Sequence, residues 1–374
     1  MAWGCGRVAA RLAAWALALT AGRSCAGASQ DWLMCACVPL ALRPFVASAF
    51  LHFLFHFASA SAGGNNFEHT SLSNANNVSA ASTFVSAWNY TLAGPSVSQP
   101  VVAMNLGAEG ANRVFIGDEE GFIHSVDLNT GLRVWRVSVG VQQTSCWDLP
   151  LGRFGASATV FLDRARNALY AMGGDGYLYE LDARSGATNW KLKLLDPTLL
   201  HSYGAVNVLG DTVLVTAASY CDHGSYRGAV ISVSRTSRKV LKKIEPASPG
   251  MGAGVWGSAG VTLFNGSAFF ATGNVISGGP EENSYLGEHV VKIDQRSFAV
   301  QSKWSPGVLE GDADFGASVV IVKPRRPTST CTKTLALVEN KVGWLFVLDV
   351  RCLSLFVVSP LLAGLVCSSR FSCS

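Results

Sequence analysis

A spaced set of Gly, Asp and Trp residues occurs twice in this chain and constrains its fold more than any other feature. The two copies are Gly121, Asp127 and Trp135, and Gly176, Asp182 and Trp190. In each copy the Gly lies six positions before the Asp, and the Trp lies eight positions after it. Residues 114–135 alternate short apolar runs with Gly-bearing turns, which predicts three antiparallel strands. The segment is therefore one unit of a repeat.

Weaker copies of this unit follow, at Ser234, Asp294 and Asp349. The anchor positions then recur about every 52 to 60 residues along the chain. A period of that size, with about four short strands per unit, is typical of a β-propeller blade. A single blade cannot bury both faces of its small sheet, so blades pack on one another. We expect five sequential antiparallel blades in an incomplete ring, with Trp135, Trp190 and Trp304 packed between blades.

Composition agrees with a β protein and excludes one class of partner. Of the 374 residues, 49% are hydrophobic, only 14% are charged and 38 are Gly, which is typical of a Gly-rich β fold or of a chain with membrane segments. The net charge of +4 is small, and its basic residues do not cluster with aromatic ones. This argues against a nucleic-acid-binding protein.

The repeat resembles that of the pyrroloquinoline quinone (PQQ) family of propellers. That family includes quinoprotein alcohol dehydrogenases, polyvinyl-alcohol-dehydrogenase-like proteins and non-catalytic scaffold relatives. The resemblance covers roughly residues 64 to 350. It implies an all-β fold, a β-propeller of the quinoprotein alcohol dehydrogenase-like type, with about five of an expected eight blades present. The repeat alone does not determine the chemistry.

The sequence divides into four expected segments. Residues 1–28 have the basic start, apolar centre and small-residue end of a secretory signal peptide, with an uncleaved anchor as the alternative. Residues 29–62 are a linker with a hydrophobic insertion, 63–350 the partial propeller, and 351–374 an apolar tail outside the repeat. We expect mature mRNA to lack 35–62 and 351–374 and to continue into further repeats.

Other features bear on where the protein resides. Residues 45–62 carry no formal charge over 18 positions, which allows membrane association as an alternative to an intron translated in frame. A signal peptide and three Asn-X-Ser/Thr sequons, at Asn77, Asn89 and Asn265, predict a secreted or secretory-pathway glycoprotein. At most one disulfide is expected among the three propeller cysteines, which are Cys146, Cys221 and Cys331.

Four residues match site motifs of the resembled enzymes, in order and spacing. Trp256, in Gly-Ala-Gly-Val-Trp-Gly, corresponds to the floor on which the flat PQQ ring stacks. Asn274, in Ala-Thr-Gly-Asn, corresponds to a Ca²⁺ ligand, and Asp314, in Asp-Ala-Asp-Phe, to the general base and a metal neighbour. Lys341 corresponds to the cation that contacts the quinone oxygens. The resemblance therefore implies PQQ and Ca²⁺ as cofactors.

Each of these residues also has a purely structural interpretation, as a core Trp, a turn Asn, a solvated loop Asp or a surface Lys. The sequence also departs from the family where a Glu metal ligand is expected, because no Glu lies between Ser219 and Gly228. Asp222 replaces it if the loop shifts by one residue, whereas ungapped alignment places His223 there, which is a poor calcium ligand. The adjacent-Cys pair of many of these enzymes is also missing.

Two functions remain open at this point. The first is a secreted PQQ- and Ca²⁺-dependent alcohol dehydrogenase that oxidises a small or polymeric alcohol by hydride transfer to the quinone, and passes electrons to an acceptor protein. The second is a catalytically silent propeller that binds a protein or glycan partner. We expect Trp256, Asn274, Asp314 and Lys341 to converge at one end of the ring, with Asp222 or His223 arriving from the third blade.

Overall fold

Four-stranded antiparallel sheets make up the fold of this protein in a computed structural model. The structure describes residues 86–149, 151–248, 250, 252–275, 286–307, 312–323 and 333–360, with side chains up to residue 355. The expected segments 1–28 and 29–62, Cys331 and residues 361–374 lie outside this part of the chain. No helix in the described part is long and apolar enough to cross a membrane.

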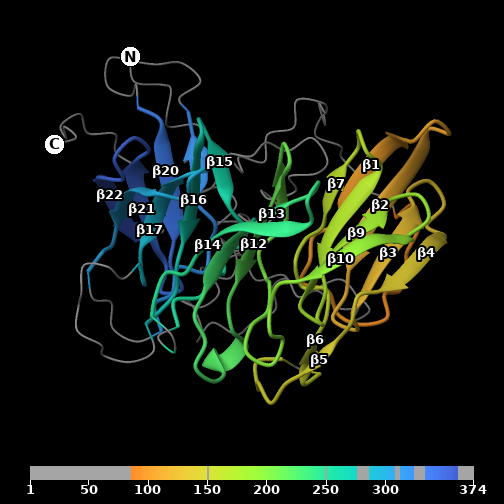
Figure 1. Cartoon of the computed structure of the whole chain (residues 1–374), viewed down its shortest axis with the longest axis horizontal. Coiled ribbons are helices and arrows are strands. Elements are labelled where there is room, and N and C mark those ends of the chain that lie inside the picture. The colour runs from red at the N-terminus through yellow and green to blue at the C-terminus, as the bar shows by residue number, and fades with distance from the viewer. Residues whose placement is uncertain are drawn as a thin grey trace, which may run out of the picture.

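Five such sheets follow one another along the described chain, and we name them blades 1 to 5 in chain order (Figure 1). Blade 1 contains β1 (Val101–Leu106), β2 (Ala111–Gly117), β3 (Phe122–Asp127) and β4 (Arg133–Ser138). Blade 2 contains β7 (Phe161–Asp163), β8 (Ala168–Met172), β9 (Tyr177–Asp182) and β10 (Thr188–Lys193). Blade 3 contains β11 (Asn207–Leu209), β12 (Thr212–Ala217), β13 (Ala229–Ser234) and β14 (Lys239–Ile244). Blade 4 contains β15 (Thr262–Phe264), β16 (Ser267–Ala271), β17 (Val290–Asp294) and β18 (Val300–Trp304). Blade 5 contains β19 (Val320–Val322), β20 (Leu335–Glu339), β21 (Trp344–Asp349) and β22 (Leu355–Pro360).

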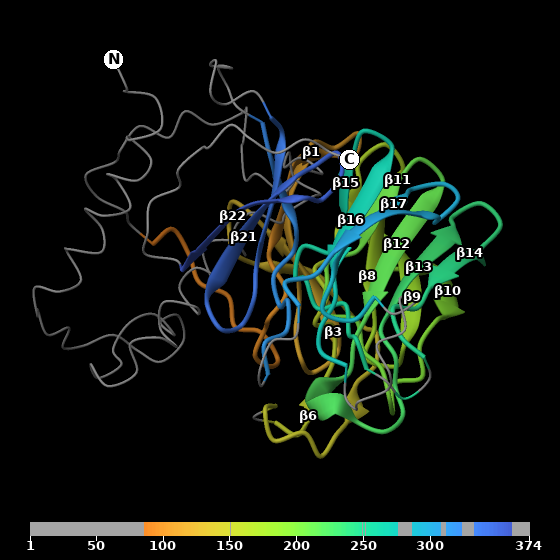
Figure 2. The same cartoon turned by 90° about the vertical axis from the view of Figure 1, so that its left-hand side faces the viewer.

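The blades stand side by side, so that their faces pack against one another (Figures 1 and 2). One hydrophobic core joins blades 1 to 3, and others join blades 3 and 4 and blades 4 and 5. The all-β prediction and its propeller architecture are therefore confirmed. The expected total of eight blades stays a prediction.

The repeated Asp closes the turn between the third and fourth strands of a blade. Asp182 Oδ1 accepts hydrogen bonds from the backbone of Arg184 and from the backbone and hydroxyl of Ser185. Asp127 and Asp294 make the same kind of turn with Thr130 and Ser297. A register shift follows at the start of the outer strand in all five blades. The sequence repeat is thus a repeat of turn hydrogen bonds and bulges.

The repeated Trp connects one blade to the next. Trp135 is buried in blade 1 and donates its Nε1–H to the carbonyl of Ala183 in blade 2, at 3.1 Å. Trp304 of blade 4 lies 5.2 Å, between ring centroids, from Phe346 of blade 5. Trp190 is buried in the core that spans blades 1 to 3. Trp88, which the sequence analysis did not single out, precedes blade 1 and donates to the carbonyl of Leu128 at 2.7 Å.

The fifth sheet extends past residue 350, the expected end of the propeller. Asp349 makes the repeated turn with Arg351, and Leu353 occupies the left-handed position where blades 1 and 2 have Gly. β22 then pairs with β21 as the fourth strand of the blade. Residues 351–360 therefore belong to blade 5, and the sequence boundary was placed too early because Leu353 replaces the expected Gly.

Gly186→Ala is expected to lower the free energy of unfolding by about 2–4 kcal/mol. Gly186 has a φ of 76°, and an added Cβ would lie 2.8 Å from the Trp135 ring. Gly210→Ala is the matched control, because Gly210 also has a positive φ of 57° but has open space around its Cβ position. Denaturant unfolding of both variants separates backbone strain from the clash with Trp135. Equal losses would show that Trp135 does not pack on this turn.

Candidate functional site at one end of the propeller

The four site residues expected from the sequence lie in connections at the same end of the blades. Asn274 and Lys341 follow the second strands of blades 4 and 5, and Trp256 and Asp314 precede the first strands of the same blades. Neighbouring strands of an antiparallel sheet run in opposite directions, so a strand's start and its neighbour's end share one edge. This places all four residues at one end of the propeller.

Backbone hydrogen bonds join these connections to each other. Gly273 donates to the carbonyl of Gly254, and Ala253 donates to the carbonyl of Asn274, both at 2.7 Å. The backbone N–H of Lys341 donates to the carbonyl of Asp314 at 2.9 Å. The site is therefore built on fixed backbone rather than on independent loops.

The side chains of Asn274, Asp312, Asp314 and Lys341 form one polar cluster. Lys341 Nζ lies 2.5 Å from Asp314 Oδ2 and 2.8 Å from Asp312 Oδ1. Asp314 also accepts a hydrogen bond from the backbone N–H of Asn274, whose Nδ2 donates to Asp312 Oδ1 at 3.1 Å. The buried Oδ1 of Asn274 has no hydrogen-bond partner among the described residues.

Burial distinguishes the two carboxylates of this cluster. Burial raises the pKa of Asp314 above its ordinary value, although the Lys341 ammonium opposes this shift. Asp312 is much more exposed. Partial burial alone would raise its pKa, but the hydrogen bonds and the positive charge of Lys341, together with hydrogen bonds to Asp314 and Asn274, lower it overall. Asp314 is therefore the more basic of the two groups, which is the property that a general base requires.

Trp256 lies beside this cluster within a group of aromatic rings. Ring centroids of His201, Tyr220 and Tyr203 lie 5.4, 6.0 and 6.4 Å from that of Trp256. An added Cβ on Gly273 would come within 2.2 Å of Asp314 Oδ1 and 3.0 Å of Trp256 Nε1. A glycine at position 273 is therefore needed for the indole and the carboxylate to lie side by side.

The structure places Asp222 and His223 away from direct contact with this cluster. Asp222 ends the short 3₁₀ turn η2 (Tyr220–Asp222) and accepts a hydrogen bond from Tyr226 Oη at 2.7 Å. His223 Nε2 lies 3.0 Å from Thr144 Oγ1. No hydrogen bond between described residues joins either one to Asn274 or Asp314. Both residues are thus engaged by other partners, and a third-blade metal ligand stays a prediction.

Sequence reasoning missed a second group of buried polar residues at the same end. Glu119 Oε2 accepts from the backbone of Gly155 at 2.8 Å and from Ser157 Oγ at 3.0 Å, and burial raises its pKa. Burial has the opposite effect on the base His201 and lowers its pKa to about 3, so this imidazole is neutral near pH 7. Neither residue lies in a sequence motif that could have identified it. The sequence around Glu119 is that of an ordinary acidic turn.

Glu339→Gln is expected to remove a pH dependence of stability. Glu339 ends β20, is 2% exposed, and neither carboxylate oxygen has a partner among the described residues. Burial raises its pKa from 4.5 to about 7, so the folded state binds the proton more tightly than the unfolded state does. The buried carboxyl therefore lowers the free energy of unfolding progressively as pH rises from about 4.5 to about 7, and by a constant amount above that.

Denaturant unfolding between pH 5 and 8 measures this effect. Glu339→Gln should be more stable than the parent by about 1–3 kcal/mol at pH 8 and close to it at pH 5. The control is Glu109→Gln, at an exposed position. If both variants keep the same slope with pH as the parent, Glu339 does not titrate as described.

Comparison with solved structures supports the propeller fold. The quinohemoprotein alcohol dehydrogenase from Comamonas testosteroni matches with a TM-score of 0.64 and 17% identity, over 86% of this chain and 52% of that one. The fold is a β-propeller. The quinohemoprotein alcohol dehydrogenase ADHIIG from Pseudomonas putida HK5 also matches this chain, with a TM-score of 0.60 and 13% identity. The match covers 86% of this chain and 49% of that one.

A europium-containing methanol dehydrogenase also matches this chain, with a TM-score of 0.54 and 15% identity, over 70% of this chain and 50% of that one. The chain thus spans about half the length of these structures. No protein-family profile and no curated protein sequence matches it. At these identities the comparison establishes the fold, and the chemistry must be argued from the site.

Proposed function

We propose that this propeller is an alcohol dehydrogenase of the PQQ- and Ca²⁺-dependent type, which oxidises an alcohol by hydride transfer to a quinone. The observation that carries the proposal is the cluster of Asn274, Asp314 and Lys341 beside Trp256. These four residue types, at one end of a propeller, are the ones that such a reaction needs. The substrate class is a small or polymeric alcohol.

The donor set at this site suits a hard divalent cation. Ca²⁺ prefers carboxylate and amide oxygens as ligands. Asn274 Oδ1 is buried and unpartnered among the described residues. The carboxylates of Asp314 and Asp312 accept hydrogen bonds from the backbone N–H and the Nδ2 of the same residue. Asn274 and Asp314 would hold the ion, with Asp312 at the exposed side. Asp222 would join them only after release from Tyr226.

Each side chain has a defined task in this proposal. Bound PQQ with its Ca²⁺ would supply the carbonyl that accepts hydride. Trp256 would provide the flat surface beneath it, and Gly254 and Gly273 would leave that surface uncovered. Asp314 would take the hydroxyl proton of the alcohol on its carboxylate. Lys341 would keep Asp314 in place and present a positive charge next to it.

One observation favours a second function, a propeller without catalysis that binds a protein or glycan partner. Asp222 is engaged by Tyr226, and no other acid of the third blade contacts Asn274 within the described residues. A site with one carboxylate fewer holds Ca²⁺ less tightly. For either function we propose a location outside the cell or in the secretory pathway, on the basis of the signal-like start and the sequons of the sequence. Only the enzyme would need an acceptor protein.

Reconstitution distinguishes the two functions. The purified protein is incubated with PQQ, with and without Ca²⁺, and then assayed for bound quinone by absorbance and for dye-linked oxidation of primary and secondary alcohols. The enzyme should bind PQQ only when Ca²⁺ is present, and Asn274→Ala should lose that Ca²⁺ dependence. Absence of both bound quinone and dye reduction would overturn the enzyme proposal in favour of the binding propeller.

A further inference from the structure

A cavity of about 270 Å³ lies beside the Trp256 cluster, at the same end of the propeller. Three connections form its walls: residues 142–145, which include β5 (Gln142–Gln143), residues 197–201 between blades 2 and 3, and residues 219–224 within blade 3. His201 and Tyr220 line it and stack on each other, with ring centroids 3.6 Å apart. The same two rings contact Trp256, so they separate the cavity from the candidate catalytic cluster.

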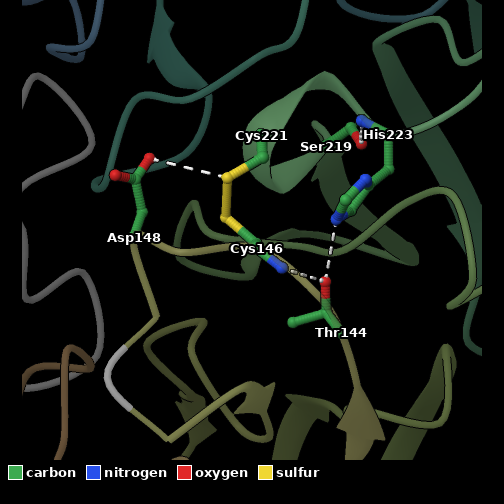
Figure 3. Close-up of a disulfide and its surroundings, with 6 residues drawn as sticks. All are labelled: Thr144, Cys146, Asp148, Ser219, Cys221 and His223. Carbon is green, nitrogen blue, oxygen red and sulfur yellow. Dashed lines mark hydrogen bonds between the residues drawn. A yellow bond between two sulfur atoms is a disulfide. The ribbon is translucent and has the colours of Figure 1, made fainter.

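Two bonds hold opposite walls of the cavity together (Figure 3). Cys146 and Cys221, two of the three propeller cysteines named from the sequence, form a disulfide with their Cα atoms 5.5 Å apart. His223 Nε2 lies 3.0 Å from Thr144 Oγ1 and spans the same two segments. The walls are therefore fixed before any ligand arrives, which lowers the entropic cost of binding.

The described residues that line the cavity mix polar and apolar groups, and none of them carries a carboxylate, an ammonium or a guanidinium group. Its polar groups are amides, hydroxyls and imidazoles, and its apolar groups include aromatic rings and leucines. The lining residues are Gln142, Gln143, Thr144, Ser145, Phe154, Pro197, Thr198, Leu199, Leu200, His201, Ser219, Tyr220, His223 and Gly224. A charged ligand would find no ion-pair partner there, whereas a neutral ligand with many hydroxyls could pair with donors and acceptors on several sides.

His201 adds an observation independent of the cavity's shape. Its side chain is 3% exposed, and its Nε2 has no hydrogen-bond partner among the described residues. A buried polar nitrogen without a partner costs free energy, and a ligand hydroxyl could pair with it once the ring turns this nitrogen toward the cavity.

We propose that this cavity binds a neutral, polyhydroxylated molecule of about monosaccharide size, with apolar ring faces against Phe154 and Tyr220 and hydroxyls on the surrounding amides and imidazoles. This goes beyond the proposed dehydrogenase activity, because binding here needs neither PQQ nor Ca²⁺. A ligand of this size that buries few atoms should bind with a dissociation constant of about 1 to 10 mM.

Ligand-observed NMR titration with D-glucose tests the proposal on the cofactor-free protein. Glucose should bind saturably, and D-glucuronate, which has the same ring with one carboxylate, should bind at least about tenfold more weakly. Leu199→Trp places a large ring in the cavity and should abolish saturation. The matched control Leu241→Trp lies on the exposed strand β14 and should leave the glucose affinity unchanged.

Two further variants keep the test decisive if Leu199→Trp does not fold. His201→Phe preserves a ring but removes the unpartnered nitrogen, and should weaken glucose binding by about fivefold to tenfold. Cys146→Ser with Cys221→Ser removes the bridge between the walls and should weaken it by a similar factor. Equal affinity for glucose and glucuronate, no saturation up to about 100 mM, or unchanged affinity in these folded variants would overturn the proposal.

Discussion

Asp314→Asn is expected to reduce the turnover number of the PQQ- and Ca²⁺-loaded protein by about a thousandfold, because the amide cannot accept the alcohol proton. The substitution keeps the shape of the side chain, and Asn Oδ1 can still accept the hydrogen bond from the backbone of Asn274. Binding of PQQ should therefore change little. Steady-state dye reduction gives kcat, and absorbance of bound quinone gives the cofactor affinity.

The pH profile supplies a second measurement on the same residue. Only the ionised form of Asp314 can take the alcohol proton. Activity should therefore rise with pH as this carboxyl loses its proton and then level off. In Asp314→Asn the residual rate should lose this limb of the profile, which a loss of structure alone would not cause.

Asp312→Asn is the control for the first variant. Asp312 shares Lys341 and Asn274 with Asp314, but its side chain is 70% exposed. It should lower kcat by less than about tenfold. If the two substitutions reduce kcat equally, the more buried carboxylate is not the base.

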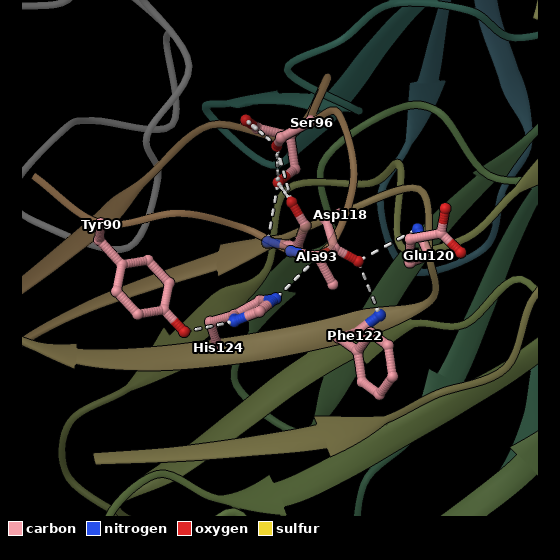
Figure 4. A network of polar contacts seen from close by, with 9 residues as sticks. Tyr90, Ala93, Ser96, Asp118, Glu120, Phe122 and His124 are labelled. Carbon is pink, nitrogen blue, oxygen red and sulfur yellow. Dashed lines mark hydrogen bonds and ion pairs between the residues drawn. The ribbon is translucent and has the colours of Figure 1, made fainter. Parts of the chain in front are cut away.

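Asp118→Ala is expected to lower the free energy of unfolding by about 3–5 kcal/mol. Asp118 is fully buried in the turn after β2, and its Oδ2 pairs with His124 Nε2 at 2.8 Å (Figure 4). Its carboxylate also accepts backbone hydrogen bonds from Ala93, Glu120 and Phe122. Removing it leaves three part-buried N–H groups and a buried imidazole without this acceptor.

The outer end of the same network provides the control. Tyr90 Oη lies 2.8 Å from His124 Nδ1, and Tyr90→Phe removes only that contact, at a cost of about 1 kcal/mol. Urea unfolding of both variants followed by fluorescence measures the difference. A loss below about 1 kcal/mol for Asp118→Ala would show that this network does not stabilise blade 1.

The repeat could be predicted from the sequence wherever the turn residue itself is repeated. Blade 3 shows where this fails, because Ser234 stands at the Asp position. Asp211, from the turn between β11 and β12, supplies the carboxylate there and accepts from Ser234 Oγ at 2.6 Å and from Thr236. The hydrogen-bond pattern is preserved while its acceptor residue moves along the chain, which no position-by-position comparison of repeats can reveal.

The candidate site also contains residues whose positions the sequence predicts and residues whose positions it does not. Asn274, Asp314 and Lys341 lie next to strand ends, so blade register alone brings them together. Asp222 lies in a connection whose direction is determined by left-handed backbone at Cys221 and Asp222, with φ of 52° and 50°. Non-Gly residues rarely adopt that conformation, so nothing in the residue types at these positions predicts it. The contacts of Glu119 and His201 depend on packing across blades and have no local signature.

The Cys146–Cys221 bridge also alters how this fold responds to proteolysis. Its two cysteines are separated by 75 positions, and every strand of blade 2 lies between them. Blade 2 is thus contained in a closed covalent ring, and one cut in any of its surface turns opens that ring without releasing a fragment. A nicked molecule would keep its full mass until a reductant is added, and both halves would stay close enough to pair again.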